Sequence, residues 1–347
     1  MRLFLAPMEG VVDHHFRALL TGIGGVDVCV TEFVRVMDHV LPSKVFKLNC
    51  PELANQSKTH SGIPVRVQLL GGQPGPVAEN AAKAAGLGAC GIDLNFGCPA
   101  RTVNRRDGGA CLLREPQRVY NIVHAVRQAV PATVPVTAKI RLGYDDKARY
   151  LENAQAVYAG GAQELTVHAR TKVEGYKPPA YWEYIADIRE HIAIPVIANG
   201  EIWSVSDFQR CRQITGCSDF MLGRGLLACP DLALQIKAAC GEQTYGPMEW
   251  CQVLEHLYDY HCVTARSYPA RFLGNRVKQW LSYLRRQYPL AQVFFDRVKR
   301  FHQLDEFERV FAECKQFQSR SEVSPASGFQ GGPGMPGTNR GMRREID

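Results

Sequence analysis

Between residues 134 and 170 the sequence reads VPVTAKIRLGYDDKARYLENAQAVYAGGAQELTVHAR, and this stretch holds one complete unit of the predicted fold. Residues 136–140 are a short run of mostly apolar and β-branched side chains, which predicts a strand buried on both faces. Residues 151–159 have apolar side chains at helical spacing, and a second strand-like run follows at 164–167. A strand, a helix and a strand in this order predict two parallel strands joined by a crossover helix.

The same unit recurs from residue 3 to about residue 225. Strand-like runs occupy residues 3–6, 28–31, 65–69, 91–94, 136–140, 164–167, 195–198 and 219–222. Most are followed by helical periodicity, as at residues 77–85, 119–130, 151–159, 185–192 and 206–214. Eight buried strands alternating with helices predict an α/β fold closed into a (β/α)8 TIM barrel, with its chemistry at the carboxyl ends of the strands. Because periodicity does not establish closure, an open doubly wound sheet is the alternative.

The remainder of the 347-residue chain has a different pattern. After about residue 240, apolar residues recur at helical spacing in residues 250–260, 277–284 and 291–301. We therefore expect a catalytic barrel at 1–240, an all-helical domain at 241–317 and a disordered Gly- and Pro-rich tail at 318–347. No stretch approaches the roughly 20 apolar residues that span a membrane, and the twelve cysteines lack metal-ligand spacing. These features predict a soluble, cytoplasmic protein with reduced thiols and with neither a membrane nor a metal partner.

The composition is that of a globular protein, with 46% hydrophobic and 22% charged residues, which excludes collagen-like and wholly disordered chains. The net charge of +7 is unevenly distributed. Residues 266–300 contain nine basic side chains and one acidic side chain, so the rest of the chain is close to neutral. A basic helical segment of this kind indicates a polyanionic partner. On a helix over residues 277–284 the apolar side chains share one face, which leaves a polar face free to contact phosphate.

Polar side chains follow the predicted strands at their carboxyl ends. In chain order they are Glu9, Gln68, Asn95, Cys98, Lys139, His168, Asn199, Glu201 and Arg224. A single Lys can be one member of a buried ion pair, and a single His can be a hydrogen-bonded core residue. The joint occurrence of these nine residues at one face of a barrel favours a functional site.

This set of residues matches a bound flavin mononucleotide. Gly200 and Gly223 follow the last two strands, where such barrels bind phosphate through backbone N–H groups, and Arg224 can add a cation. Lys139 can place positive charge beside the N1/O2 edge of the isoalloxazine ring, and Gln68 can hydrogen-bond its pyrimidine ring.

Cys98 lies between Gly97 and Pro99 just beyond the fourth predicted strand, where a helix cannot continue. We expect its thiol to point toward the barrel mouth. With an unperturbed pKa of about 8.5 a thiol is mostly protonated at neutral pH, so it can act as a general acid. The other interpretation is a small buried thiol, which we expect for most of the other cysteines.

Several segments, in order, resemble the tRNA-dihydrouridine synthase family. They are APMEG (6–10), NFGCPARTV (95–103), the strand with Lys139, HART (168–171), ANGEI (198–202) and GRG (223–225). The resemblance covers about residues 1–315. Within the family, TEFVRV (31–36) and VKQWLSYL (277–284) resemble the bacterial C subfamily, which acts on uridine 16 of the tRNA D-loop.

The resemblance implies an oxidoreductase that reduces the C5–C6 double bond of a tRNA uridine, with FMN as cofactor and NADPH as reductant. It implies that hydride passes from the reduced flavin to C6 and that Cys98 gives a proton to C5. The implied FMN-binding residues are Pro7, Met8, Glu9, Gln68, Lys139, His168, Asn199, Gly200, Glu201, Gly223 and Arg224. The implied tRNA-binding residues are Arg35, Asn95, Tyr176, Arg276, Lys278 and Tyr283. Because one chain supplies the whole site, we expect a monomer.

Four alternatives remain open. A flavin barrel enzyme acting on a small molecule would use the same phosphate loops and Lys139, but it leaves the basic helical segment unexplained. A dihydrouridine synthase for another D-loop position would keep the chemistry. A Schiff-base aldolase built on Lys139 would leave Cys98 without a role. A non-catalytic RNA-binding module would tolerate loss of the Cys98 thiol.

Overall fold

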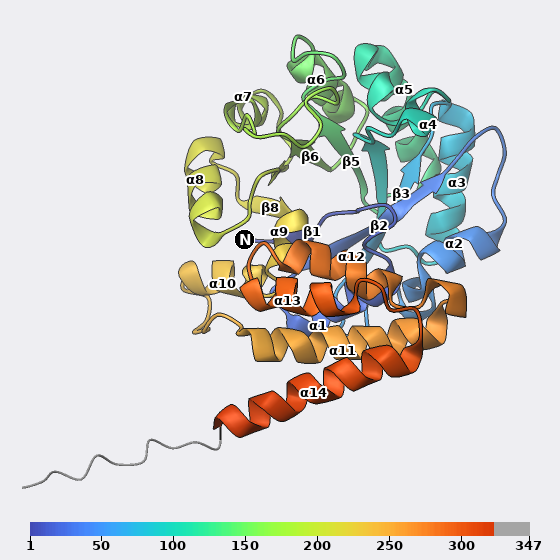
Figure 1. The fold of residues 1–347 in the computed structure, drawn as a ribbon. Helices are drawn as coiled ribbons and strands as arrows, with labels where there is room; N and C mark the ends of the chain where they lie inside the picture. The colour runs from blue at the N-terminus through green and yellow to red at the C-terminus, as the bar shows by residue number, and fades with distance from the viewer. Residues whose placement is uncertain (323–347) are drawn as a thin grey trace, which may run out of the picture.

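The computed structural model describes residues 1–322, with side chains described through residue 314. Residues 3–222 form a closed barrel of eight parallel strands in sequence order (Figure 1). The strands are β1 (Leu3–Leu5), β2 (Val28–Arg35), β3 (Val65–Leu70), β4 (Ile92–Phe96), β5 (Val136–Arg141), β6 (Glu164–His168), β7 (Val196–Asn199) and β8 (Asp219–Leu222). β8 pairs with β1 in parallel, which closes the sheet. The predicted (β/α)8 barrel is confirmed, and the open doubly wound sheet is excluded because its edge strands would stay unpaired.

The strands bury both of their faces. Alternate residues of β1, β2, β7 and β8 belong to two different apolar clusters, because successive side chains of a strand point to opposite faces. The smaller cluster consists of Phe4, Ala6, Val28, Val30, Ile197 and Met221. The larger cluster packs the strands against the surrounding helices. Burial on both faces explains why the strand segments read as continuous apolar runs.

Helices follow the strands, and most of them cover the outside of the barrel. They are α1 (His14–Ile23), α2 (Ser43–Asn49), α3 (Pro74–Gly86), α4 (Arg101–Asn104), α5 (Pro116–Ala129), α6 (Tyr150–Ala159), α7 (Glu183–His191), α8 (Val205–Thr215), α9 (Arg224–Ala228) and α10 (Leu232–Ala239), with 3-10 helices η1 (Pro51–Asn55) and η2 (Gly109–Arg114). The five predicted barrel helices correspond to α3, α5, α6, α7 and α8. The short helices α2, α4 and α9 offer too few residues for periodicity to be seen. Helix α1 escapes prediction because Arg17 and Thr21 stand on its buried face.

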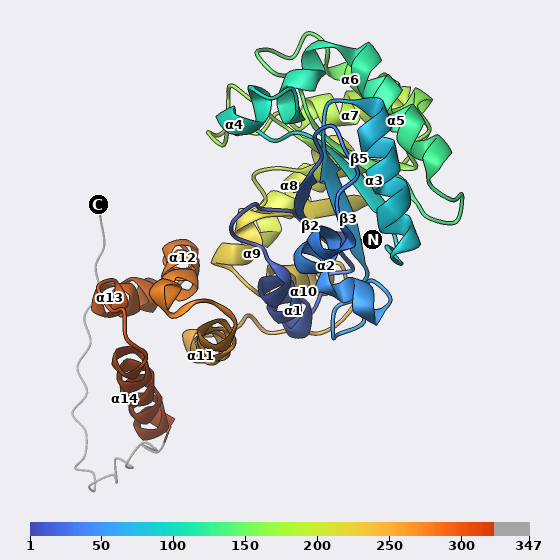
Figure 2. The same cartoon turned by 90° about the vertical axis from the view of Figure 1, so that its right-hand side faces the viewer.

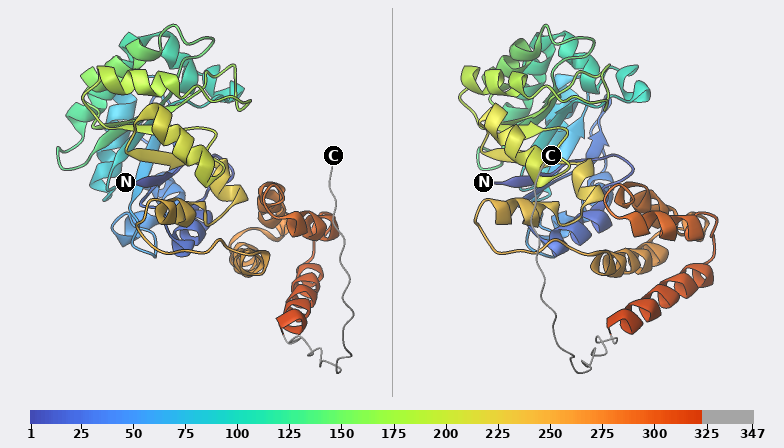
Figure 3. Two further views of the ribbon diagram at one scale, coloured as in Figure 1. Left: turned by 90° about the vertical axis from the view of Figure 1, so that its left-hand side faces the viewer. Right: turned by 60° about the vertical axis from the view of Figure 1, so that its left-hand side comes forward.

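The C-terminal helices gather to one side of the barrel, next to α1, α9 and α10 (Figures 2 and 3). They are α11 (Trp250–Ser267), η3 (Ala270–Phe272), α12 (Asn275–Leu284), α13 (Pro289–Val298) and α14 (Leu304–Glu322). Helix α12 buries the predicted apolar face, formed by Val277, Trp280, Leu281 and Leu284. Helix α14 continues past residue 317, where we expected the domain to end. Residues 323–347 of the predicted tail lie outside the described residues.

Three further observations concern residues 1–322 only. No helix in this range has both the length and the apolarity of a membrane span. Among the side chains described, those of residues 1–314, no three His, Cys, Asp or Glu are arranged to hold a metal ion. All twelve cysteines of the chain fall in this range, and the structure pairs none of them in a disulfide.

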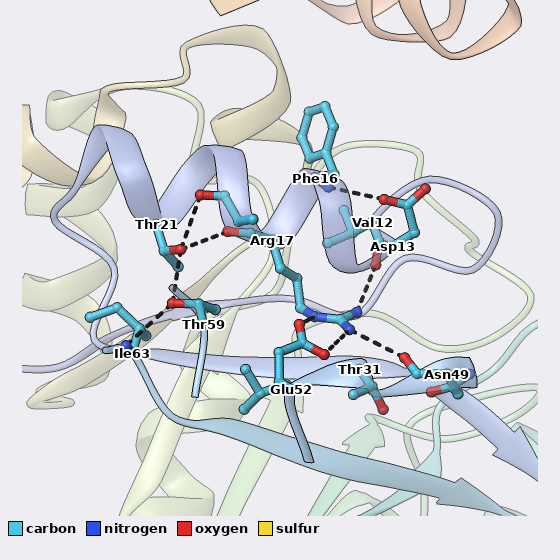
Figure 4. A network of polar contacts seen from close by, with 12 residues as sticks. Val12, Asp13, Phe16, Arg17, Thr21, Thr31, Asn49, Glu52, Thr59 and Ile63 are labelled. Carbon is cyan, nitrogen blue, oxygen red and sulfur yellow. Dashed lines mark hydrogen bonds and ion pairs between the residues drawn. The ribbon is translucent and has the colours of Figure 1, made fainter. Parts of the chain in front are cut away.

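A buried ion pair ties α1 to η1 (Figure 4). The side chain of Arg17 is 0% exposed, and it donates from Nε and Nη2 to the two carboxylate oxygens of Glu52 at 2.8 and 2.9 Å. Its guanidinium also donates to the carbonyl oxygens of Val12 and Asn49 at 3.3 and 3.2 Å. Burial alone raises the pKa of Glu52, but the hydrogen bonds and charge of Arg17 outweigh burial and hold this pKa below its ordinary value.

We predict that Arg17→Met lowers the free energy of unfolding by about 3–5 kcal/mol, because it leaves the Glu52 carboxylate buried without its cation. Chemical denaturation at pH 7 measures the change. The double variant Arg17→Met with Glu52→Gln removes both charges and is expected to regain part of the loss. A single variant as stable as the wild type would show that the pair contributes nothing.

Candidate active site

A cavity of about 650 Å³ opens at the carboxyl ends of the strands. Residues in or just after all eight strands line it, together with Tyr283 of α12. Its volume lies within the range of about 300–1,000 Å³ that is typical of ligand and cofactor sites. This is the face at which a (β/α)8 barrel carries its functional residues.

The cavity brings together most of the residues singled out from the sequence. Every residue expected to hold the cofactor lines it: Pro7, Met8, Glu9, Gln68, Lys139, His168, Asn199, Gly200, Glu201, Gly223 and Arg224. Cys98, Asn95, Tyr176 and Tyr283 line the same cavity. Arg35, Arg276 and Lys278 are not part of its lining.

These three cations have other surroundings. Arg35 lines a neighbouring groove, and its Nη2 donates to a carbonyl oxygen of α4 at 3.1 Å. Arg276 forms an ion pair with Asp13 at 3.1 Å. Lys278 donates from Nζ to the carbonyl oxygen of Phe301 at 2.6 Å. Arg276 and Lys278 therefore donate hydrogen bonds to other parts of the protein. The helical pattern of the sequence cannot predict these contacts, because it does not show which face of the helix packs against the barrel.

Lys139 is a half-buried cation on the cavity wall. It projects from β5, and its Nζ donates to Oδ1 of Asn199 at 2.8 Å. Burial, with a smaller contribution from the charge of Arg141, lowers the pKa of Lys139 to about 7. Its hydrogen-bond partner is an amide oxygen and not a carboxylate. An anionic or electron-rich ligand in the cavity would stabilise the charged form of Lys139.

Arg141 joins two loops of the site. Its Nε donates to the carbonyl oxygen of Gly97 at 2.8 Å, and its Nη1 donates to the carbonyl oxygens of Thr171 and Gly175 at 3.0 and 2.9 Å. It thereby connects the loop that follows β4 to the loop that follows β6. The sequence alone assigns Arg141 no role, although its spacing of two from Lys139 places both side chains on the same side of β5.

An ion-pair group stands at the ends of β6, β7 and β8. Glu201 pairs with the fully buried Arg170, and its Oε2 lies 3.9 Å from Nη2 of Arg224. Burial and the charges of the surrounding cations lower the pKa of His168 well below its ordinary value, so its imidazole is neutral at pH 7. Gly200 has a φ of +118°, and a Cβ there would lie 2.9 Å from the His168 ring. Only glycine therefore fits at this position.

Asn95 fixes the loop that carries Cys98. Its Oδ1 accepts hydrogen bonds from the backbone N–H groups of Gly97 and Cys98, each at 2.9 Å. Its Nδ2 donates to Oε1 of Gln68 at 2.7 Å. Gly109 packs against the same loop, where an added Cβ would lie 3.0 Å from both Cβ and the carbonyl oxygen of Cys98. These contacts determine where the thiol lies.

The Cys98 thiol is partly exposed and lines the cavity. Burial raises the pKa of this thiol above its ordinary value. The thiol is therefore protonated at neutral pH, which is the form that a general acid requires. Burial likewise raises the pKa of Glu9 and of Glu32 in the same cavity.

Comparison with known proteins matches most of the chain to one family. Residues 4–326 match the family described as Dihydrouridine synthase (Dus). The chain is 52% identical over 315 residues to the tRNA-dihydrouridine(16) synthase of Shewanella oneidensis, an alignment that covers 91% of this chain and 98% of that protein. It is 52% identical over 300 residues to the tRNA-dihydrouridine(16) synthase of Pseudomonas putida, covering 86% of this chain and 93% of that protein.

A solved structure shows the fold alone. Histamine dehydrogenase from Rhizobium sp. 4-9 aligns with a TM-score of 0.52 and 16% sequence identity, over 70% of this chain and 46% of that chain. Many unrelated functions share the (β/α)8 barrel, so this likeness carries no activity. The family match is different in kind, because it includes the C-terminal helices as well as the barrel. The two relatives are matched over nearly their whole length. The chain therefore belongs to the dihydrouridine synthase family.

Proposed function

We propose that this protein is an FMN-dependent synthase that reduces the C5–C6 double bond of uridine 16 in the D-loop of tRNA, with NADPH as reductant. The observation that carries the proposal is that the Cys98 thiol and the half-buried Lys139 line one cavity. A proton donor and a cation suited to an electron-rich ring therefore face the same ligand space. The 52% identity to two tRNA-dihydrouridine(16) synthases supports the substrate and its position.

The cavity residues fit FMN. Arg224 would pair with its phosphate beside the backbone of Gly200 and Gly223. Lys139 would face the N1/O2 edge, and Gln68 has a second amide N–H for the pyrimidine ring, since Asp93 accepts the first at 2.7 Å. The other residues proposed to hold FMN are Pro7, Met8, Glu9, His168, Asn199 and Glu201. When bound, FMN that NADPH has reduced supplies the hydride for C6 of the uracil.

Cys98 supplies the proton for C5. Its thiol is protonated at neutral pH because burial raises its pKa. Asn95 holds the backbone N–H of Cys98, so the orientation of the loop is set before the substrate binds. Once the proton has moved to C5, the thiolate of Cys98 takes a proton from water and the donor is restored.

The uridine has to leave its base stack to reach the cavity. Tyr176, which is 52% exposed, and Tyr283 line the cavity and are proposed to contact the nucleotide there together with Asn95. Arg35 lines the adjoining groove and is proposed to contact the tRNA backbone there. Arg276 and Lys278 are proposed to act on tRNA through the positive field of the helical segment, since their donors have partners inside the protein.

We predict that Cys98→Ala lowers the rate of dihydrouridine formation about 10²- to 10⁴-fold, because the proton donor is lost. Single-turnover reduction of tRNA by the prereduced enzyme measures the rate. FMN content and tRNA affinity are expected to stay at the wild-type level. Cys111→Ala is the matched control, because Cys111 lies near the same loop but its thiol donates to the carbonyl oxygen of Gly108 at 3.3 Å. Unchanged turnover in Cys98→Ala would show that another group gives the proton to C5. A wild-type protein that binds tRNA but forms no dihydrouridine would favour a non-catalytic RNA-binding module.

We predict that the affinity for FMN falls as the pH rises above 7. Lys139 has a pKa of about 7 without the cofactor, and an anionic ligand raises this pKa. Binding above pH 7 then takes up one proton, so affinity drops by up to about tenfold per pH unit until the pKa of the bound state is reached. Quenching of flavin fluorescence between about pH 7 and 9 measures it, a range in which the phosphate, with a second pKa of about 6, stays ionised. A slope that persists in Lys139→Met would contradict this assignment.

We predict that tRNA from cells without the gene lacks dihydrouridine at position 16 alone. Site-resolved mapping of dihydrouridine in tRNA from cells with and without the gene tests this. Loss at another D-loop position would keep the chemistry and change the target. No loss anywhere, from a protein that purifies with FMN, would instead favour a flavin enzyme acting on a small molecule.

A further inference from the structure

Helix α12 contacts three of the segments that line the candidate cofactor cavity. They are the loop between β1 and α1, helix α9 after β8, and the loop between β7 and α8. The contacts come from Arg276, Gln279 and Trp280 within the helix and from Arg286 just after it. All four side chains belong to the helical part of the chain and reach across to the barrel.

The first contact holds the loop between β1 and α1 at Gly10. The carbonyl oxygen of Gly10 accepts hydrogen bonds from Nη1 of Arg276 at 2.7 Å and from Nε2 of Gln279 at 3.0 Å. The backbone N–H of Gly10 donates to the carboxylate of Glu32 on β2. Both polar backbone groups of Gly10 are therefore held, directly after Glu9, which lines the cavity.

Asp13 anchors the other end of this loop. Its Oδ1 accepts from the backbone N–H of Phe16 at 2.9 Å and so caps α1. Its Oδ2 accepts from the hydroxyl of Tyr268 and lies 3.1 Å from Nη2 of Arg276. The Asp13 side chain is 8% exposed and that of Arg276 is 22% exposed, so solvent screens this ion pair only weakly. Arg276 thus bridges both ends of the loop, at Gly10 and at Asp13.

The second and third contacts lie at the ends of β8 and β7. The buried Trp280 donates from Nε1 to the carbonyl oxygen of Leu227 in α9 at 3.0 Å, and α9 begins at Arg224. The guanidinium carbon of Arg286 lies 4.0 Å from the centre of the Trp203 ring, which lines the cavity. A cation over an indole face at this distance is an attractive contact.

We propose that α12 is a positioning element of the cofactor site: it holds three cavity segments in the shape that binds FMN, so the affinity of the barrel for FMN depends on the helical domain. The inference rests on the proposed cofactor and deepens that proposal. It gives Arg276 a different role from the tRNA contact that the resemblance implies. By thermodynamic linkage, FMN stabilises the docked position of α12 by the same factor.

The test titrates FMN into the full-length protein stripped of cofactor, with no tRNA present, and follows quenching of flavin fluorescence. Gln279→Leu removes one donor to Gly10, and we expect the Kd for FMN to rise about 3- to 10-fold, as for the loss of one hydrogen bond. Arg276→Met removes the bridge between Gly10 and Asp13, and we expect a rise of about 10-fold or more. Arg276→Lys is expected to recover part of the loss, because an ammonium can pair with Asp13 but cannot bridge both ends.

Arg285→Ala is the matched control. It removes one positive charge at the end of the same helix, but the Arg285 guanidinium contacts the carbonyl oxygen of Ser282, the side chain of Gln292 and the ring of Phe295, all in the helical part. We expect the wild-type Kd for FMN in this variant. If Arg276→Met fails to fold by circular dichroism, Gln279→Leu carries the test.

Hydrogen exchange of the wild-type protein gives a readout that needs no substitution. FMN is expected to slow exchange at the amides of α12 as well as in the loop between β1 and α1. A wild-type Kd in both Gln279→Leu and Arg276→Met, with unchanged exchange in α12, would overturn the inference and leave the FMN proposal intact. A wild-type protein that binds no FMN would overturn the proposed function itself.

Discussion

Burial of positive charge at the carboxyl ends of β5 and β6 is the constraint on which the rest of the site depends. Removing a cation from water is unfavourable, and each of these cations is offset in a different way. Arg170 has the carboxylate of Glu201, and Arg141 has three backbone carbonyl oxygens. Lys139 has one amide oxygen, and its pKa is lowered accordingly. The cations on the cavity wall would therefore be stabilised by a ligand that is anionic or electron-rich.

The proposed proton donor, Cys98, is held by a chain of hydrogen bonds that begins in the barrel core. Thr137 donates to Asp93 at 2.6 Å, Gln68 donates to the same carboxylate at 2.7 Å, and Asn95 donates to Gln68 at 2.7 Å. The backbone N–H of Cys98 then donates to Asn95 at 2.9 Å. The first members stand on strands, which are the most rigid elements of a barrel, and a site supported by strands is more accurate than one built on loops alone. The strands therefore fix the conformation of the loop that carries Cys98.

The fold and the place of the site could be predicted because both follow from local pattern. Strands buried on two faces read as apolar runs, and parallel strands bring their carboxyl ends to one face, so residues as distant as Glu9 and Arg224 were expected together. The hydrogen-bond partner of each polar side chain in the site could not be predicted from the sequence. Arg276 and Asn95 carry the groups expected of RNA ligands, yet these groups bind other parts of the protein. Helix α1 is hidden for the same reason, since the buried Arg17 reads as a surface residue until Glu52 is seen beside it.

The hydrogen bonds from Arg276 and Gln279 to Gly10 join segments that are made at different times. Arg276 leaves the ribosome 266 residues after its partner Gly10. At roughly 5–20 residues per second this separation is on the order of 10–50 s of synthesis. Strand β1 likewise lacks its pairing with β8 until β8 has been made. In the nascent chain the loop between β1 and α1 therefore lacks these contacts until the helical part emerges.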